Sequence, residues 1–256
     1  MRLGFIGTGE IAKAIVVGFC RSTVSDLSMM VSPRGQETSK ALAQTYNQVE
    51  RCRSNQEVLD RCDIAVLAVP PSDALEVVKG LIFRPEQQVI SVVPFLLLAD
   101  LQRAASPARH CCRAIPLPTV AHHRCPIPVL NGNEELLALL QAIGQPFAVD
   151  DERHLHVLWT LTGLIAPFYD WLGTLGRWSS EQGVDPVLAD RFAVDMVEAL
   201  CVSAQQTPPL SFTELSHHAA TPRGMNEQAA REIHGQDCHA AYAQVLDRLL
   251  ARFPQV

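Results

Sequence analysis

The sequence predicts a two-part chain, with a doubly wound α/β domain over 1–150 and an all-helical domain over 151–256. Three observations lead to this division. A short apolar strand at the start of the chain runs directly into a glycine-rich turn and a helix. Strand and helix signals then alternate as far as Asp150, which is typical of a parallel sheet with crossover helices. Beyond Asp150 the signals are helical, with almost no strand pattern.

The first element is the strand Leu3–Ile6, and the turn Gly7-Thr8-Gly9-Glu10-Ile11-Ala12 joins it to a helix over Glu10–Phe19. The first glycine permits a tight turn, the second lets a pyrophosphate approach the backbone, and the alanine keeps helix and strand close. The helix N-terminus adds unpaired N–H groups and the positive end of a dipole. We therefore expect a dinucleotide site in which the pyrophosphate is held by Gly7, Thr8, Gly9, Glu10 and Ile11. A purely structural tight turn is the alternative.

The second strand, Leu27–Val31, ends about 20 residues after the glycines, as a dinucleotide-binding fingerprint requires. Proteins specific for NAD place a carboxylate at this point to bind the ribose hydroxyls. This chain has Ser32-Pro33-Arg34-Gly35 instead, with a guanidinium that can pair with a 2′-phosphate. We predict NADPH as the cofactor, with Ser32 and Arg34 holding its 2′-phosphate. A solvated turn arginine is the alternative for Arg34.

The following helices and strands continue the alternation. A continuous apolar run over Ile64–Val69 predicts a central parallel strand that is buried on both faces. Its end at Pro70-Pro71 cannot continue a sheet, so these prolines lie at the carboxyl edge, where such sheets bind ligands. Ser72 or Asp73 is expected to cap the next helix. The remaining elements of this Rossmann-type domain are helices over 35–46, 55–60, 73–81 and 134–143, and strands over 48–51, 88–93, 112–115, 129–131 and 146–149.

Helices are predicted in the second part over 153–163, 166–182, 186–205, 222–234 and 237–252, with a break at Thr207-Pro208-Pro209. Apolar residues surround much of the helix that begins at Pro186. A helix of that kind buries one face in its own core and another in a partner subunit. We therefore expect a homodimer formed through these helices, with further assembly left open. No segment is long and apolar enough to be a predicted membrane span.

Composition and charge exclude several other classes of protein. The net charge of −6 and the lack of a basic tract argue against nucleic acid or an anionic membrane as a partner. The eight cysteines are scattered without a C-x-x-C pair, and the adjacent histidines His122-His123 and His217-His218 point different ways, so no metal site is predicted. Because the N-terminal apolar residues form a strand rather than a signal peptide, we expect a reduced, cytoplasmic protein.

A set of short segments spread over nearly the whole chain resembles one known family, the pyrroline-5-carboxylate reductases, which reduce a cyclic imine to proline with NAD(P)H. The segments are Gly4-Phe5-Ile6-Gly7-Thr8-Gly9, Val31-Ser32-Pro33-Arg34, Leu67-Ala68-Val69-Pro70-Pro71, Val89-Ile90-Ser91-Val92, Arg113-Ala114-Ile115-Pro116, Thr162-Gly163 with Pro167, and Thr221-Pro222-Arg223-Gly224. The resemblance implies a Rossmann domain and a helical domain that exchanges helices with a second subunit, with each active site at that interface. Val69, Pro70 and Pro71 are then expected to flank the nicotinamide ribose.

The sequence departs from the family where the family binds its substrate. Family members have Ser-Pro-Gly-Gly, a small residue and Thr where this chain has Thr221-Pro222-Arg223-Gly224-Met225-Asn226. There the helix N-terminus holds the substrate carboxylate, and the threonine hydroxyl lies near the imine nitrogen. The resemblance therefore places Thr221, Arg223, Gly224 and Met225 at the substrate and Asn226 in the catalytic position. Arg223 is either an added carboxylate clamp or a solvated residue of the first helical turn. Further departures are Pro94-Phe95 and Pro116-Leu117-Pro118-Thr119.

The expected activity is hydride transfer from NADPH to the C=N bond of a small imine, cyclic or derived from a keto acid, that bears a carboxylate. Whether this imine is pyrroline-5-carboxylate or another compound is left open. One alternative is a catalytically silent NADP-binding sensor or scaffold derived from a reductase. A second is a β-hydroxyacid dehydrogenase, which the sequence disfavours because such enzymes use a lysine in the helical half, whereas Lys13, Lys40 and Lys79 all lie in the first. A third is a deazaflavin cofactor, against which Arg34 argues.

Overall fold

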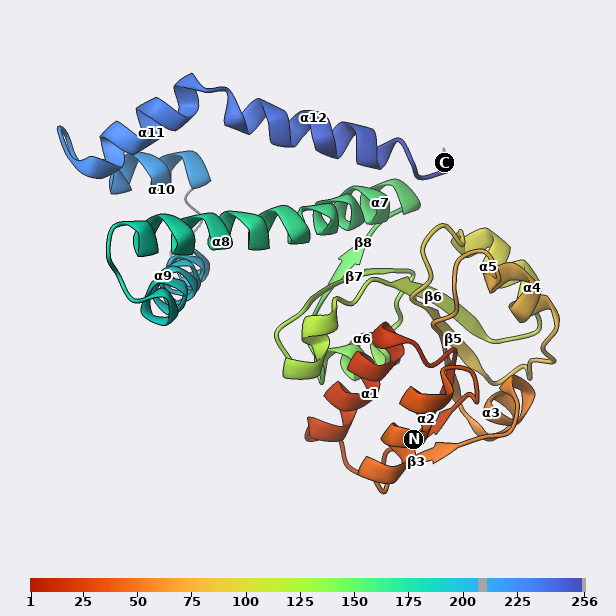
Figure 1. Ribbon diagram of the computed structural model, residues 1–256. Helices are drawn as coiled ribbons and strands as arrows, with labels where there is room; N and C mark the ends of the chain where they lie inside the picture. Colours follow the sequence, from red (N-terminus) through yellow and green to blue (C-terminus); the bar gives the residue numbers. More distant parts are fainter. Residues whose placement is uncertain (207–210, 255–256) are drawn as a thin grey trace. The chain divides into compact units, whose positions relative to one another are not determined.

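A computed structural model describes residues 1–206 and 211–254 (Figure 1). The chain divides into two compact units. The first contains Met1–Trp159 together with the C-terminal residues from Phe253, and the second is Thr160–Arg252. The expected break at Thr207-Pro208-Pro209 lies outside the described residues.

The first unit is built on an eight-stranded sheet with the order β3-β2-β1-β4-β5-β6-β7-β8. Neighbouring strands are parallel except for β6 and β7, so the predicted doubly wound α/β fold is confirmed. Between β6 and β7 the chain passes through the 3₁₀ turn η1 Pro118–His122 and enters the sheet in the opposite direction. The strands are β1 Arg2–Ile6, β2 Ser28–Val31, β3 Val49–Arg51, β4 Ile64–Leu67, β5 Gln88–Ser91, β6 His110–Ala114, β7 Pro126–Leu130 and β8 Gln145–Val149.

Side chains of the central strands alternate between two apolar cores, one on each face of the sheet. In β4, Ile64 and Val66 belong to the first core, whereas Ala65 and Leu67 belong to the second. The first core includes residues of α1 Glu10–Arg21, α2 Gln36–Thr45 and α6 Glu134–Gln141. The second includes residues of α3 Asn55–Arg61, α4 Ala74–Lys79 and α5 Leu98–Ala104. Helices therefore cover both faces, and the carboxyl edge between β1 and β4, where the strand order reverses, is the position at which such sheets bind ligands.

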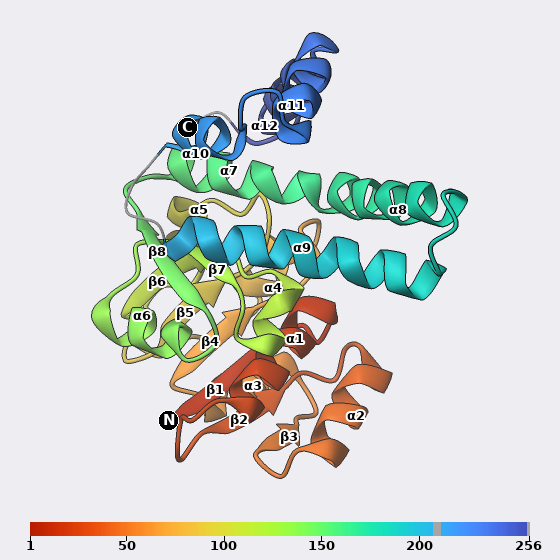
Figure 2. The ribbon, with the colours of Figure 1, turned by 90° about the vertical axis from the view of Figure 1, so that its left-hand side faces the viewer.

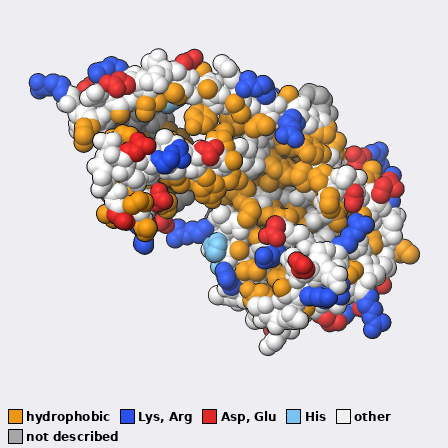
Figure 3. Space-filling model, in the orientation of Figure 1, with side chains coloured by type: hydrophobic (Ala, Val, Ile, Leu, Met, Phe, Trp, Pro, Cys, Tyr) orange, Lys and Arg blue, Asp and Glu red, His pale blue; other side chains and the backbone are white. Residues whose placement is uncertain are grey.

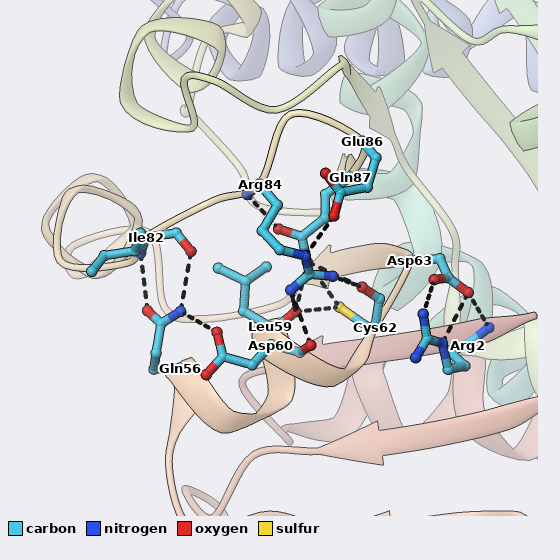
Figure 4. Close-up of polar contacts among 10 residues, drawn as sticks. All are labelled: Arg2, Gln56, Leu59, Asp60, Cys62, Asp63, Ile82, Arg84, Glu86 and Gln87. Carbon is cyan, nitrogen blue, oxygen red and sulfur yellow. Dashed lines mark hydrogen bonds and ion pairs between the residues drawn. The ribbon is translucent and has the colours of Figure 1, made fainter.

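Polar side chains secure the C-terminal end of α3 on the second face (Figure 4). The buried Gln87 donates from Nε2 to the carbonyl oxygens of Leu59 at 2.6 Å and Cys62 at 3.0 Å. Arg84 donates to the same two oxygens and to that of Asp60. The last carbonyls of a helix have no intrahelical partner, so these bonds join α3 to the segment that enters β5. The loops that lead into β4 and β5 are thereby held against each other at the amino ends of the two strands.

The second unit is helical, as the sequence predicts. Its elements are the 3₁₀ turn η2 Leu161–Leu164, α8 Ile165–Glu181, α9 Pro186–Gln206, α10 Phe212–Ala219, α11 Met225–Gly235 and α12 Cys238–Leu250. Helices α8 and α9 lie side by side in both ribbon views (Figures 1 and 2). Helix α10 was missed, although Ser211 and Glu214 form a capping box at its start. Among the described helices, none combines the length and apolar character needed to cross a membrane.

Candidate functional site

Two glycines allow the loops at the carboxyl edge of the sheet to approach one another closely. Gly7, at the end of β1, has φ +93°, and a Cβ there would lie 2.5 Å from the carbonyl oxygen of Ala68, which follows β4. Gly35, which precedes α2, has φ +70°, and its Cβ would lie 2.3 Å from the carbonyl oxygen of Thr8. Both backbone conformations lie in the left-handed region that favours glycine. Glycine at these two positions therefore brings the loops after β1, β2 and β4 together.

The side chain of Ser32 holds the glycine-rich turn in place. The Gly7 N–H donates to Ser32 Oγ at 2.9 Å, and Thr8 Oγ1 donates to the Ser32 carbonyl oxygen at 3.0 Å. The Thr8 and Ser32 hydroxyls are also 3.1 Å apart, and both residues are buried. Ser32 thus fixes the turn from inside the protein, and it does not line the cavity described below. Its expected contact with a 2′-phosphate stays a prediction.

The start of α1 can receive an anion. Gly9 is the N-cap of this helix and has no side chain that could cap the N–H groups of the first turn. A Cβ placed on Gly9 would meet no protein atom within 4 Å. Gly9 therefore faces open space rather than packing against a neighbouring element. A dinucleotide pyrophosphate fits this arrangement, because it needs a close backbone approach and free N–H donors at a helix N-terminus.

A cavity of about 490 Å³ opens beside this turn. It lies at the carboxyl edge, between the loops that follow β1, β2 and β4. Its lining residues are Gly7, Thr8, Gly9, Arg34, Gly35, Ala68, Val69 and Pro70. Of the predicted cofactor residues, Glu10, Ile11, Ser32 and Pro71 do not line it. The structure thus brings together the two glycines, Arg34 and the end of the β4 strand, which the sequence analysis selected from three separate segments.

Arg34 extends from the loop after β2 and makes an ion pair with a residue that the sequence analysis had not connected with it. Its Nη1 lies 3.3 Å from Oδ2 of Asp73, which is in the loop after β4. Both side chains are substantially exposed, at 67% and 45%. An exposed pair of this kind contributes about 0–1 kcal/mol, so an arriving phosphate can exchange with the carboxylate. Arg34 is therefore available to a ligand while being held at the cavity.

The predicted substrate residues form one turn at the start of α11 in the second unit. Gly224 is the N-cap, and its N–H donates to the Thr221 carbonyl oxygen at 2.8 Å. Arg223 has φ +64°, a left-handed conformation at the position where the family described above has glycine. The Arg223 N–H donates to Glu227 Oε2 at 2.6 Å, and Asn226 Nδ2 donates to the Ala219 carbonyl oxygen at 3.1 Å. Met225 is exposed. These hydrogen bonds close a tight turn at the start of α11.

Sequence analysis missed a buried charged cluster centred on Arg113 of β6. Its guanidinium pairs with Glu152 of α7 (Glu152–Thr160), and its Nη1 lies 3.3 Å from Nε2 of His156. Glu152 also accepts the Leu98 N–H, at 2.5 Å. Burial lowers the pKa of Arg113. The pKa of His156 is also lowered, first by burial and then by the Arg113 charge. The neutral imidazole is therefore favoured beside the permanent cation.

Aromatic side chains cover this cluster. The Trp159 ring lies 5.6 Å from the Arg113 guanidinium carbon, and the Phe253 ring stacks on His156 with centroids 4.5 Å apart. Phe253 also contacts Phe95 and Trp159. Arg113 Nε has no hydrogen-bond partner among the described residues. The only sequence signal was an arginine within an otherwise apolar strand, which indicates a buried charge but does not identify its partners.

The chain is similar to known oxidoreductases both in sequence and in fold. Residues 2–94 match the family model described as NADP oxidoreductase coenzyme F420-dependent. A pyrroline-5-carboxylate reductase of Pseudomonas aeruginosa is 24% identical over 96% of this chain and 93% of its own. Pyrroline-5-carboxylate reductase 2 of Bacillus subtilis is 22% identical over 100% of this chain and 95% of its own. A crystal structure of Plasmodium falciparum pyrroline carboxylate reductase with NADP bound superimposes with a TM-score of 0.83 at 14% identity, covering 98% and 96% of the two chains.

The resemblance predicted from the sequence is thus confirmed, and the low identity fits a divergent relative. The structural likeness confirms the predicted Rossmann-type fold followed by a helical region. Together with the family model, these findings support an NAD(P)-dependent oxidoreductase.

The open space at Gly9 gives a first prediction. Gly9→Ala adds a methyl group where no protein atom lies, and Gly9 has φ −87°, which alanine tolerates. The variant should keep the thermal stability of the parent but bind NADPH about tenfold more weakly, because the methyl group occupies the approach of the pyrophosphate. Gly7→Ala is the matched comparison. It should lower the thermal stability of the protein, because its Cβ would lie 2.5 Å from the carbonyl oxygen of Ala68. Unchanged NADPH affinity in a folded Gly9→Ala protein, measured by calorimetry, would contradict a pyrophosphate site at Gly9.

Proposed function

We propose that this chain, a divergent relative of the pyrroline-5-carboxylate reductases, is an NADPH-dependent reductase that transfers hydride to the C=N bond of a small, carboxylate-bearing imine. The observation that carries the proposal is the cavity in which Arg34 stands with the Gly7-Thr8-Gly9 turn and the end of β4. A guanidinium at this place suits a 2′-phosphate, and the uncapped helix start suits a pyrophosphate. The free thiols of the cysteines support a reducing, cytoplasmic location.

Reduction of an imine demands little from protein side chains. The nicotinamide, when bound, supplies the hydride. The protein must therefore bind and orient the cofactor and the imine, and exclude water from between them. In this proposal Val69, Pro70 and Pro71 restrict the nicotinamide ribose at the end of β4. These apolar or rigid residues can align the nicotinamide ring without placing a charged side chain beside it. A protonated imine is already electrophilic, so a single hydrogen-bonding group at its nitrogen suffices.

We assign that group to Asn226, with Thr221, Arg223, Gly224 and Met225 binding the substrate. The bond from Asn226 Nδ2 to Ala219 fixes the amide, which leaves its carbonyl oxygen suited to accept the hydrogen of a protonated imine nitrogen. The N-terminus of α11 supplies the field that favours a carboxylate. The Arg223 side chain, on a backbone in the left-handed region, adds a cationic contact for that carboxylate.

The size of these substitutions favours a substrate other than pyrroline-5-carboxylate. Asn226 has an amide where the family has a threonine hydroxyl, and Met225 replaces a small residue. Both changes add volume and alter the hydrogen-bonding groups of the substrate turn. A site built to hydrogen-bond one group discriminates strongly against analogues that leave that group unpaired. A different cyclic imine, or an imine formed from a keto acid and an amine, fits such a rebuilt turn.

The assay that tests the proposal follows NADPH oxidation by the purified protein with pyrroline-5-carboxylate, piperideine-carboxylate and a panel of keto acids with amines. Turnover on an imine other than pyrroline-5-carboxylate is the expected result. NADPH binding without turnover on any substrate would favour the silent binding protein. The family model's description also names coenzyme F420, so the reduced deazaflavin is assayed in parallel as hydride donor. Turnover with that donor alone would overturn the assignment of NADPH.

Arg34→Ala tests the cofactor assignment separately from catalysis. Losing a charged hydrogen bond to the 2′-phosphate should weaken NADPH binding by about 1.5–3 kcal/mol, roughly a 10- to 150-fold rise in dissociation constant. NADH lacks the 2′-phosphate, so its binding should be nearly unchanged. Titration of both cofactors against the same protein preparation provides the comparison, and an equal loss for the two would refute the role of Arg34.

We also propose that the protein is a homodimer formed through its helical unit. Hydrophobic side chains are exposed on helical elements in the space-filling view (Figure 3). Within α9 alone, Val187, Phe192 and Leu200 are 78%, 68% and 63% exposed. Exposed apolar groups of this size on one helix are typical of a surface that another subunit covers. The exchange of helices that the family resemblance implies provides that cover.

A mass measurement by analytical ultracentrifugation tests the dimer. The expected mass is twice the chain mass of 28.1 kDa. Phe192→Glu should shift the equilibrium toward the single chain, because it would bury an unpaired charge in the interface. Arg191→Ser, a change at a neighbouring exposed polar residue of the same helix, is the control. A parent protein that stays a single chain at micromolar concentration would contradict the proposal.

A further inference from the structure

We infer that Asp73 sets the preference between NADPH and NADH, because its carboxylate competes with the 2′-phosphate for Arg34. This inference rests on the proposed cofactor function and adds a second residue to it. The carboxylate that NAD-specific proteins place at the end of β2 is missing here. The structure supplies one from another strand, since Asp73 follows β4 and reaches the Arg34 guanidinium at 3.3 Å.

The orientation of Asp73 supports this role. Asp73 directly precedes α4, but its backbone already lies in the right-handed helical region, with φ −99° and ψ −14°, unlike the extended backbone of a capping residue. Its carboxylate accordingly makes no capping hydrogen bond within the described structure. Instead Oδ1 accepts the Ser72 hydroxyl at 2.9 Å and Oδ2 faces Arg34. Both carboxylate oxygens are thus engaged away from α4, and one of them faces an arginine that lines the cavity.

The position of the ion pair relative to the cavity gives the second argument. Arg34 and Pro70 both line it, and the Asp73 N–H donates to the Pro70 carbonyl oxygen at 3.0 Å, which fixes Asp73 against the lining loop. The ion pair therefore spans the two loops between which an adenosine ribose would lie. A phosphate bound by Arg34 would come close to the Asp73 carboxylate. Two negative charges that lie close together repel each other measurably even near the protein surface.

The two cofactors should respond differently to this carboxylate. NADPH must either displace Asp73 from Arg34 or tolerate a negative charge beside its 2′-phosphate. NADH has a hydroxyl at that place, which can donate a hydrogen bond to Asp73 as it does to the acidic residue of NAD-specific proteins. Asp73 thus weakens binding of NADPH without weakening that of NADH, and the protein discriminates less between the two cofactors than Arg34 alone would dictate.

The test compares Asp73→Asn with the parent by calorimetric titration of the full chain with NADPH and NADH, and with the fragments 2′,5′-ADP and 5′-AMP. We expect the NADPH dissociation constant to fall about three- to tenfold, the 2′,5′-ADP constant to fall with it, and the NADH constant to stay the same or rise. The gain should shrink at about 1 M salt, where the Debye length is about 3 Å. These are binding measurements, so they do not depend on finding the substrate.

Glu76→Gln is the matched control, because it removes one negative charge from an exposed residue of α4 that pairs with Lys79 and not with Arg34. Unchanged or weaker NADPH binding by Asp73→Asn would overturn the inference. An equal gain for both cofactors, or the same gain in Glu76→Gln, would overturn it as well. A parent protein that binds neither cofactor would refute the proposed function itself, and the inference with it.

Discussion

The arrangement of the carboxyl edge depends on the hydrogen bonds between Ser32 and the Gly7-Thr8 turn. They tie the loop after β1 to the loop after β2 from within the protein. The positive φ angles of Gly7 and Gly35 make the close approach possible. With the loops fixed in this way, the start of α1 faces the cavity and Arg34 stands at its side. The form of the cavity thus rests on a buried serine that does not line it.

Sequence patterns predicted the fold well because the deciding signals are local. A strand, a glycine turn and a helix identify the first βα unit, and the apolar run that begins at Ile64 identifies a strand buried on both faces. The antiparallel β7 was not anticipated, because strand direction depends on the path by which the chain returns to the sheet, and no local pattern records that path. The helix α7 was assigned to the second part, whereas nearly all of it lies in the first unit, where Arg113 of β6 pairs with its Glu152.

The candidate site divides in the same way between local and long-range information. The glycines, Arg34, Val69 and Pro70 follow strand ends, and adjacent strand ends meet at one edge of a parallel sheet. Their convergence on one cavity could therefore be predicted. The pairing of Arg34 with Asp73 could not, because helix-cap statistics direct Asp73 to its own helix. The buried partners of Arg113 could not be predicted either. Arg113 and Glu152 are 39 positions apart in the sequence, and a salt bridge over that separation leaves no periodic pattern.

The return of the chain to the first unit at Phe253 makes the helical unit a topological insertion. Trp159 and Phe253, which stand on either side of the inserted segment, lie with ring centroids 5.8 Å apart. The aromatic cover of the buried Arg113 is thus completed by a residue near the end of the described chain. During synthesis, which proceeds from the N-terminus, the first unit acquires this cover only after the entire helical unit has been made.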